Sequence, residues 1–234
     1  MARIEESVDH AAFRVGALGA ILTAVGVLTS GPLALLAVVF VQPQPEWGGP
    51  DLFVASFHRI QTLPFYCGFL LLAGSILMLA SICALSKHRA AALAAFAFAS
   101  IGAAFAMFNY ATQTTFIPAV VSAYSPELGP LVSAYSMSNP RSLAWALEMW
   151  GYGFIGLGTW LAAGFFTAGR LETIAKSLFI LNGVLSIPGA LVVSVNLSGV
   201  FTLAGLIGYG VWNVAYFALA VAFYLVMRKR RAAR

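Results

Sequence analysis

Residues 63–85 read LPFYCGFLLLAGSILMLASICAL, a run without a single charged side chain. A transmembrane α-helix needs about 20 predominantly apolar residues, because the hydrocarbon core of a bilayer is about 30 Å thick. This run is longer than that, and charged residues mark its two ends, Arg59 before it and Lys87 after it. The stretch therefore predicts a helix that crosses a membrane.

The same pattern recurs along the chain, each time bounded by charges or by proline and glycine. The apolar stretches cover residues 15–41, 63–85, 90–117, 143–167, 174–195 and 200–227. We therefore expect an all-α integral membrane protein, a bundle of about six transmembrane helices that forms one polytopic domain over residues 1–234. Gly31-Pro32 lies inside the first stretch and predicts a kink there, with Thr29 and Ser30 available to bond the freed backbone groups.

Composition independently requires the bilayer as solvent. Hydrophobic residues make up 61% of the chain and charged residues 9%, whereas an average soluble domain has about 45 to 50% and about 25%. So few charges cannot cover a water-soluble surface. The net charge of +5 would suit nucleic acid, but the basic residues form no face interleaved with aromatics, so we expect no nucleic-acid partner.

The distribution of Lys and Arg predicts the orientation. If the N-terminus is inside, eleven of the thirteen basic residues lie on the cytoplasmic side, and only Arg59 and Arg141 lie outside. This positive-inside bias places both termini in the cytoplasm, and the Ala- and Gly-rich composition fits the cytoplasmic (inner) membrane of a bacterium. The last stretch is followed directly by a basic tail, consisting of Arg228, Lys229, Arg230, Arg231 and Arg234. Such a tail can bind anionic lipid headgroups, although a simple topology determinant is the commoner role.

The two outer loops, 42–62 and 122–141, are the long connections. The first opens with prolines, after which Asp51 can cap a short amphipathic helix. The second contains an internal echo, because Val-Ser-Ala-Tyr-Ser occurs at 121–125 and again at 132–136. We expect both loops to lie on the outer face as interfacial caps with their aromatic side chains at headgroup level.

Glu148 is the only acidic residue inside an expected span. Burial of a carboxylate near the bilayer centre is costly, so such residues usually pair, stay protonated or face water. Glu148 follows Arg141 by about 10 Å of helix, which places it in the outer third of the membrane. It can either bond donors at the edge of the interface or serve a function, and the sequence leaves both interpretations open.

Polar groups of neighbouring spans fall at the level of Glu148. Asn109 and Gln113 share a helix face at the outer end of the third span, and Arg59 stands at the outer start of the second. Our principal site hypothesis is an outward-facing vestibule with ligand-binding residues Glu148, Tyr152, Asn109, Gln113, Arg59 and Trp150. A carboxylate among aromatic rings can hold a lipophilic cation or exchange a proton for it. The tryptophan side chains of the fourth span also fit an interfacial aromatic belt.

A second polar group is expected near the membrane midplane. It consists of Asn182 in the fifth span and of Tyr209, Asn213 and Tyr216 in the sixth. The segment 186–189, Ser-Ile-Pro-Gly, should break the fifth helix, and transporters often hold substrate at such discontinuous helices. Interhelical hydrogen bonding is the commoner role of lone asparagines.

Motifs for catalysis and metal binding are missing from the sequence. The three histidines, His10, His58 and His88, lie outside the spans at different levels, so neither a haem nor a zinc site can be assembled from them. There is no His-Glu-x-x-His, Gly-x-Ser-x-Gly or Walker motif. We expect no metal and no cofactor, and we disfavour an enzyme.

Three functions remain open. The leading hypothesis is a protein that binds or transports a small or lipophilic molecule, such as a cation, through the vestibule around Glu148. The second is an accessory or scaffold subunit that docks a partner through faces of small residues, as a homo- or hetero-oligomer. The third is an integral membrane enzyme acting on lipid, with Glu148 and His58 as its acid and base.

Overall fold

A computed structural model describes the backbone of residues 2–167 and 169–233, and the side chains from Asp9 onward within the same limits. Every regular element in these residues is helical, which confirms the all-α class. Five helical segments are long and apolar enough to cross a membrane, namely Asp9–Val41, Arg59–Leu85, Arg89–Ser122, Gly169–Val195 and Leu203–Ala232. Arg234, the last residue of the basic tail, lies outside the described residues.

The helices follow one another with short connections. Their bounds are α1 (Ala2–Leu28), α2 (Ala34–Val41), α3 (Pro50–Ser56), α4 (Leu63–Leu85), α5 (Arg89–Ala111), α6 (Ile117–Ser122), α7 (Gly129–Tyr135), α8 (Leu143–Ala162), α9 (Gly169–Val195) and α10 (Leu203–Ala232). α8 has 20 residues and is not one of these five segments; it contains Glu148 and several glycines. It corresponds to the fourth expected span.

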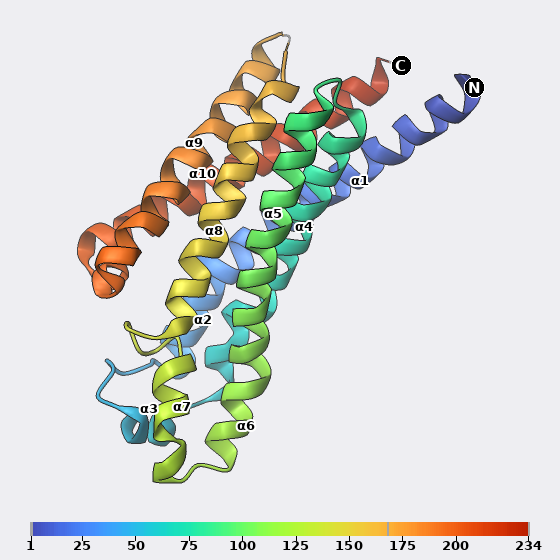
Figure 1. Ribbon diagram of the computed structural model, residues 1–234. Helices are drawn as coiled ribbons and strands as arrows, with labels where there is room; N and C mark the ends of the chain where they lie inside the picture. Colours follow the sequence, from blue (N-terminus) through green and yellow to red (C-terminus); the bar gives the residue numbers. More distant parts are fainter. Residues whose placement is uncertain (1, 168, 234) are drawn as a thin grey trace.

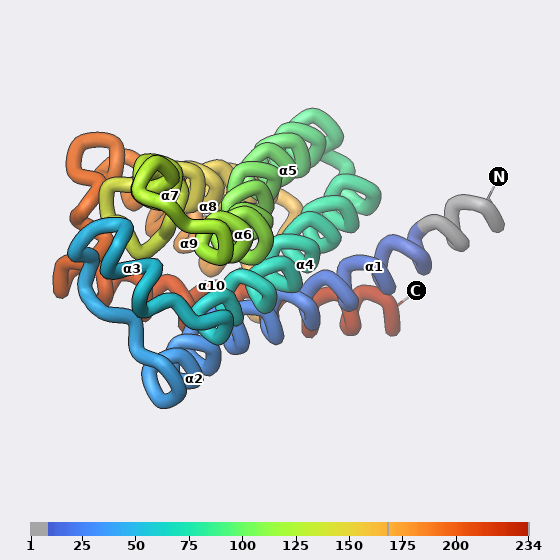
Figure 2. Tube along the Cα trace, turned by 90° about the horizontal axis from the view of Figure 1, so that it is seen from below, coloured from blue at the N-terminus to red at the C-terminus, as the bar shows by residue number. Residues whose placement is uncertain are grey.

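The long helices form a ring. Each packs along two others, in the order α1, α4, α5, α8, α9, α10 and back to α1. The view along the bundle shows this arrangement (Figure 2). Both termini lie at one end, together with the α4–α5 and α8–α9 turns, whereas α3, α6 and α7 gather at the other end (Figure 1). The chain therefore returns to the end at which it began.

Pro32 and Pro188 have different effects on the helices that contain them. At Pro32 the chain forms a π-helical turn, Thr29–Leu33, which joins α1 to α2, and the hydroxyl of Thr29 donates to the Val25 carbonyl at 2.7 Å. The irregularity expected in the first span is therefore present as a π-helical turn. The break expected at residues 186–189 is wrong, because α9 continues through Pro188. Close packing of α9 against α8 keeps the helix continuous there.

The two long loops form a compact cap. α5 continues through a π-helical turn, Thr112–Phe116, into α6, so this helix runs beyond the expected end at residue 117. Phe53, Ile117, Val120 and Val132 make a small apolar cluster of their own, separate from the main core. The cap is thus held together by its own hydrophobic contacts as well as by its attachment to the helices.

Asp51 has a different role from the one expected. α3 begins at Pro50, after Gly49 with a φ of 111°, and no side chain caps it. Pro50 occupies the first helical position, where its fixed φ suits the helix. Asp51 instead accepts a hydrogen bond from the hydroxyl of Tyr124, and this bond raises the pKa of Tyr124. Asp51 therefore links the two loops of the cap.

The α1–α4 contact predicts a position-dependent effect of adding a methyl group to a glycine. A Cβ at Gly74 would collide with the backbone nitrogen of Thr23, whereas a Cβ at Gly208 in α10 would meet no atom within 4 Å. Gly74→Ala should lower the stability of the detergent-solubilised protein by about 1–3 kcal/mol, because overpacking forces the two backbones apart. Thermal unfolding measures this change.

Gly208→Ala is the matched control, and it should leave stability unchanged or raise it through the higher helix propensity of alanine. Equal effects at Gly74 and Gly208 would contradict the close α1–α4 packing.

Candidate functional site

The Glu148 carboxylate joins α8 to α5. Its Oε2 accepts a hydrogen bond from Asn109 Nδ2 at 2.9 Å, and its Oε1 accepts one from the Tyr110 hydroxyl at 2.8 Å. Asn109 and Tyr110 are 0% and 4% exposed. Each carboxylate oxygen therefore has a buried neutral donor. Glu148 and Asn109, which the vestibule hypothesis groups together, are thus in direct contact.

The network extends from Tyr110 back to α8. The hydroxyls of Tyr110 and Tyr152 are 2.7 Å apart, and either can be the donor. The Tyr152 ring then packs edge-on against Trp212 of α10, with ring centroids 4.8 Å apart. Tyr110 is itself held between Phe65 and Phe69 of α4, at centroid distances of 5.8 and 5.7 Å. Polar and aromatic contacts thus connect four helices around the carboxylate.

Gln113 ties the loop 136–142 to α5. Its Nε2 donates to Asn109 Oδ1 at 3.1 Å and to the Tyr135 carbonyl at 2.7 Å, while its Oε1 accepts from the Met137 amide at 3.1 Å. Met137 Sδ lies 3.0 Å from Asn109 Nδ2. The Trp145 indole fixes the same loop by donating to the Met137 carbonyl at 2.8 Å. Met137 therefore closes over the Glu148 cluster.

Asn182 is the centre of the second polar group. Its Nδ2 donates to Thr159 Oγ1 of α8 at 2.9 Å, and its Oδ1 accepts from Trp212 Nε1 at 3.0 Å. The Trp212 indole also lies 3.0 Å from Ser186 Oγ. Asn182 thus bonds both neighbouring helices, which agrees with the interhelical role considered for it. Because Trp212 touches Tyr152, the two polar groups are continuous.

The polar residues expected on α10, Tyr209, Asn213 and Tyr216, contact two different helices. The Tyr216 hydroxyl pairs with Ser75 Oγ of α4 at 2.7 Å. Asn213 donates to the Tyr209 carbonyl at 2.8 Å, and its Oδ1 lies against Gly31 in the π-helical turn. Tyr209 and Asn213 therefore face the first helix, and Trp212, rather than either of them, reaches Asn182.

Two expected vestibule residues lie outside this network. Arg59 is exposed, and none of its described hydrogen bonds or ion pairs reaches Glu148. Trp150 is 37% exposed and packs against Phe154 on α8, with centroids 5.9 Å apart. The structure brings together Glu148, Tyr152, Asn109 and Gln113 from the vestibule hypothesis.

Tyr110 and Trp212 are the central residues that the sequence interpretation missed. Tyr110 directly follows Asn109 and lies one helical turn before Thr114. It is therefore one residue of a polar run, and the sequence alone does not distinguish it from its neighbours. Trp212 resembles an interfacial belt residue, although its spacing of four from Tyr216 places both on one helix face. This spacing in the sequence could have identified Trp212 as a partner of Tyr216. In the structure the two rings stack with centroids 5.0 Å apart.

The charge of Glu148 has no basic partner among the described contacts. Its hydrogen bonds come from an amide and a phenol, whereas Glu172 at the other end of the bundle is paired with Arg230. Within the described part of the chain, no group of three His, Cys, Asp or Glu side chains is placed to hold a metal ion. The site is therefore a carboxylate in an aromatic, neutral surrounding.

Comparisons of the chain with protein-family models, with curated proteins and with solved structures give no significant match. The inference of function accordingly depends on the site itself.

The Gln113 contacts predict that the loop 136–142 opens when the Gln113 side chain loses its amide group. Gln113→Leu leaves the Tyr135 carbonyl and the Met137 amide without their partner. Loss of such bonds costs about 1–3 kcal/mol. Hydrogen exchange of the Met137 amide should therefore become about 10-fold faster or more.

Thr112→Val is the control, because the described hydrogen bond of the Thr112 hydroxyl goes to the Phe108 carbonyl of its own helix. Unchanged exchange at Met137 in Gln113→Leu would show that the loop is held by other contacts.

Proposed function

We propose that the chain is a six-span membrane protein with both termini in the cytoplasm, and that it binds or transports a small lipophilic cation at Glu148 from the outer side. α8 packs between α5 and α9 in the ring, which supports counting it as a membrane span in addition to the five long apolar segments. Its 20 residues match the length that a bilayer requires. The excess of Lys and Arg at the end with the termini supports the orientation.

The unpaired charge of Glu148 is the observation that carries the proposal. A carboxylate inside a helix bundle costs several kcal/mol when no positive charge or proton neutralises it. The described donors to Glu148, Asn109 and Tyr110, are neutral. The site is therefore completed either by a proton or by a cation, which are then in competition.

The surrounding rings favour a lipophilic cation. Tyr110, Tyr152 and Trp212 lie in one continuous set of contacts with the carboxylate. Aromatic faces attract organic cations, and the attraction is strongest where water is excluded. The Tyr110–Tyr152 hydrogen bond can run in either direction, so the pair can adapt to a change in the protonation of Glu148 by reversing the donor.

Access from the outer side requires movement of the loop 136–142. Met137 lies against Asn109 and is held by Gln113 and Trp145. Release of these few bonds uncovers the carboxylate while the ring of helices stays intact. The loop then acts as a lid over the site.

Glu148→Gln tests the proposed function. The amide keeps the size of the side chain and removes its charge, so binding of radiolabelled tetraphenylphosphonium to the purified protein should weaken at least about 10-fold, as expected for the loss of a desolvated charge interaction. Glu127→Gln is the control, since Glu127 is an exposed residue of the cap. Equal affinity of native protein and Glu148→Gln would sink the proposal.

Cysteine labelling tests the topology. In a variant with Cys67 and Cys83 replaced by alanine, a membrane-impermeant maleimide should label Ala123→Cys in intact cells. Lys87→Cys and Arg231→Cys should react only after the cells are permeabilised. They lie in the α4–α5 turn and in the last turn of α10, two segments at the end with the termini (Figure 1). Labelling of Arg231→Cys from outside would mean that α8 does not cross the membrane.

A second candidate function is that of an accessory subunit, which is favoured by two glycines in the outer half of α10. Gly208 and Gly210 face open space there, and small residues let a second helix approach closely. In this case a partner protein would remain bound during purification in native lipid.

A further inference from the structure

A cavity of about 260 Å³ is lined by residues next to the α4–α5 and α8–α9 turns. Both turns lie at the end of the bundle where the termini are (Figure 1). The cavity lies between the ends of α4, α5 and α8. Most of its wall is apolar, formed by Ile82, Ala91, Ala92, Leu161, Ala162 and Phe165. A pocket that takes a whole drug-sized ligand has about 300–1,000 Å³. This cavity is smaller, so it fits one apolar segment of a larger molecule.

Basic residues flank one residue of the cavity wall. His88 lines the cavity, and its neighbours in the sequence are Lys87 in the α4–α5 turn and Arg89 at the start of α5. All three residues are exposed. Ser86 Oγ accepts a hydrogen bond from the His88 amide at 3.1 Å, which fixes the turn. None of the described ion pairs neutralises Lys87 or Arg89. Two cationic residues therefore flank His88 at the rim of the apolar hollow.

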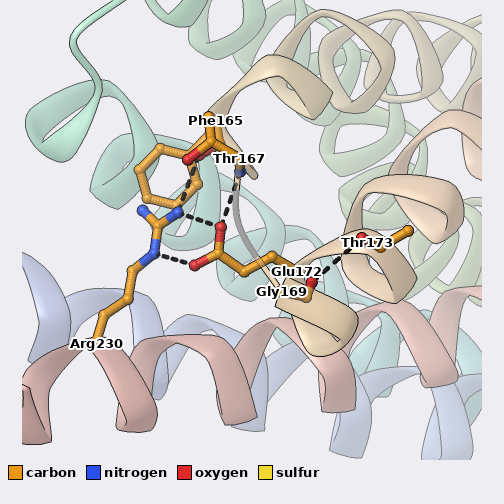
Figure 3. A network of polar contacts seen from close by, with 6 residues as sticks. All are labelled: Phe165, Thr167, Gly169, Glu172, Thr173 and Arg230. Atoms are coloured by element: carbon orange, nitrogen blue, oxygen red, sulfur yellow. Dashed lines mark hydrogen bonds and ion pairs between the residues drawn. The ribbon is translucent and has the colours of Figure 1, made fainter.

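The Phe165 wall is held in place by the basic tail. The Arg230 guanidinium lies 4.2 Å over the centroid of the Phe165 ring and donates to the Phe165 carbonyl at 3.1 Å (Figure 3). Glu172 accepts from the same guanidinium at 2.8 and 2.7 Å and from the Thr167 amide at 2.8 Å. Arg230 is thus neutralised by Glu172 and braces the α8–α9 turn. The cavity has a fixed wall on this side.

We propose that this cavity binds an anionic phospholipid, with a segment of one acyl chain in the hollow and the headgroup phosphate at Lys87 and Arg89. Apolar walls below cationic side chains match a molecule with an apolar chain and an anionic head. The position at the end of the membrane-spanning helices places the rim at headgroup level, where basic pockets between helices bind anionic lipids. The site is independent of Glu148 and of any cation bound there.

Charge variants test the headgroup contact. The purified full-length protein is titrated with dioleoylphosphatidylglycerol and with dioleoylphosphatidylcholine, and retained lipid is counted by native mass spectrometry. The double variant Lys87→Gln/Arg89→Gln should raise the Kd for phosphatidylglycerol about 30-fold, as expected for two lost basic residues. Lys229→Gln/Arg231→Gln removes the same charge from exposed tail positions and should change the Kd less than about threefold.

A cavity-filling variant tests the acyl contact. Gly164 lines the cavity, and a Cβ there would meet no atom within 4 Å. Gly164→Leu should therefore abolish retention of phosphatidylglycerol while the temperature of unfolding stays unchanged. Unchanged retention in this variant would overturn the proposal. Equal retention of the two lipids, equal effects of the two double variants, or displacement of the lipid by inorganic phosphate would overturn it as well.

Discussion

The Glu148 carboxylate, bonded by Asn109 and Tyr110, is the interaction on which the interior of the bundle depends. It lies on α8 and accepts hydrogen bonds from two adjacent residues of α5. A carboxylate is costly in this position, since its charge lacks a basic partner among the described contacts. In the proposed function, the same cost that makes Glu148 unfavourable for stability favours binding of a proton or a cation.

Hydrogen bonds and ring contacts connect Glu148 with several helices of the ring. From Glu148 the contacts pass through Tyr152 to Trp212, and from Trp212 to Asn182 on α9 and Tyr216 beside α4. Toward the cap, they pass through the side-chain amides of Asn109 and Gln113 to the loop 136–142. Continuous contacts therefore connect Glu148 with this loop and with α9 and α10.

Hydropathy predicts most of this fold because a bilayer tolerates few alternatives to long apolar helices. Hydropathy predicts less where contacts between helices determine whether a helix continues or ends. The continuation of α9 through Pro188 depends on the close approach of α8, and the length of the α5–α6 helix depends on the apolar cluster of the cap. Neither contact is visible in a local pattern. An isolated apolar stretch cannot tell whether the helix ends at the membrane surface or continues into a cap.

The site was predictable in part for the same reason. Glu148, Asn109 and Gln113 stand out because polar groups are rare in an apolar helix. Tyr110 and Trp212 do not stand out, since aromatic side chains are common at membrane interfaces and in cores alike. Their importance comes from the hydroxyl and indole hydrogens that they direct at Tyr152, Glu148 and Asn182, and these directions require the three-dimensional structure.

Proton release during cation binding tests the central claim most directly. The purified protein, in weakly buffered detergent solution near neutral pH, is mixed with tetraphenylphosphonium while a pH-indicator dye reports the protons that enter the solution. The account predicts that a proton leaves as the cation binds, because both neutralise the Glu148 carboxylate. Binding of the cation without any release of protons would contradict it.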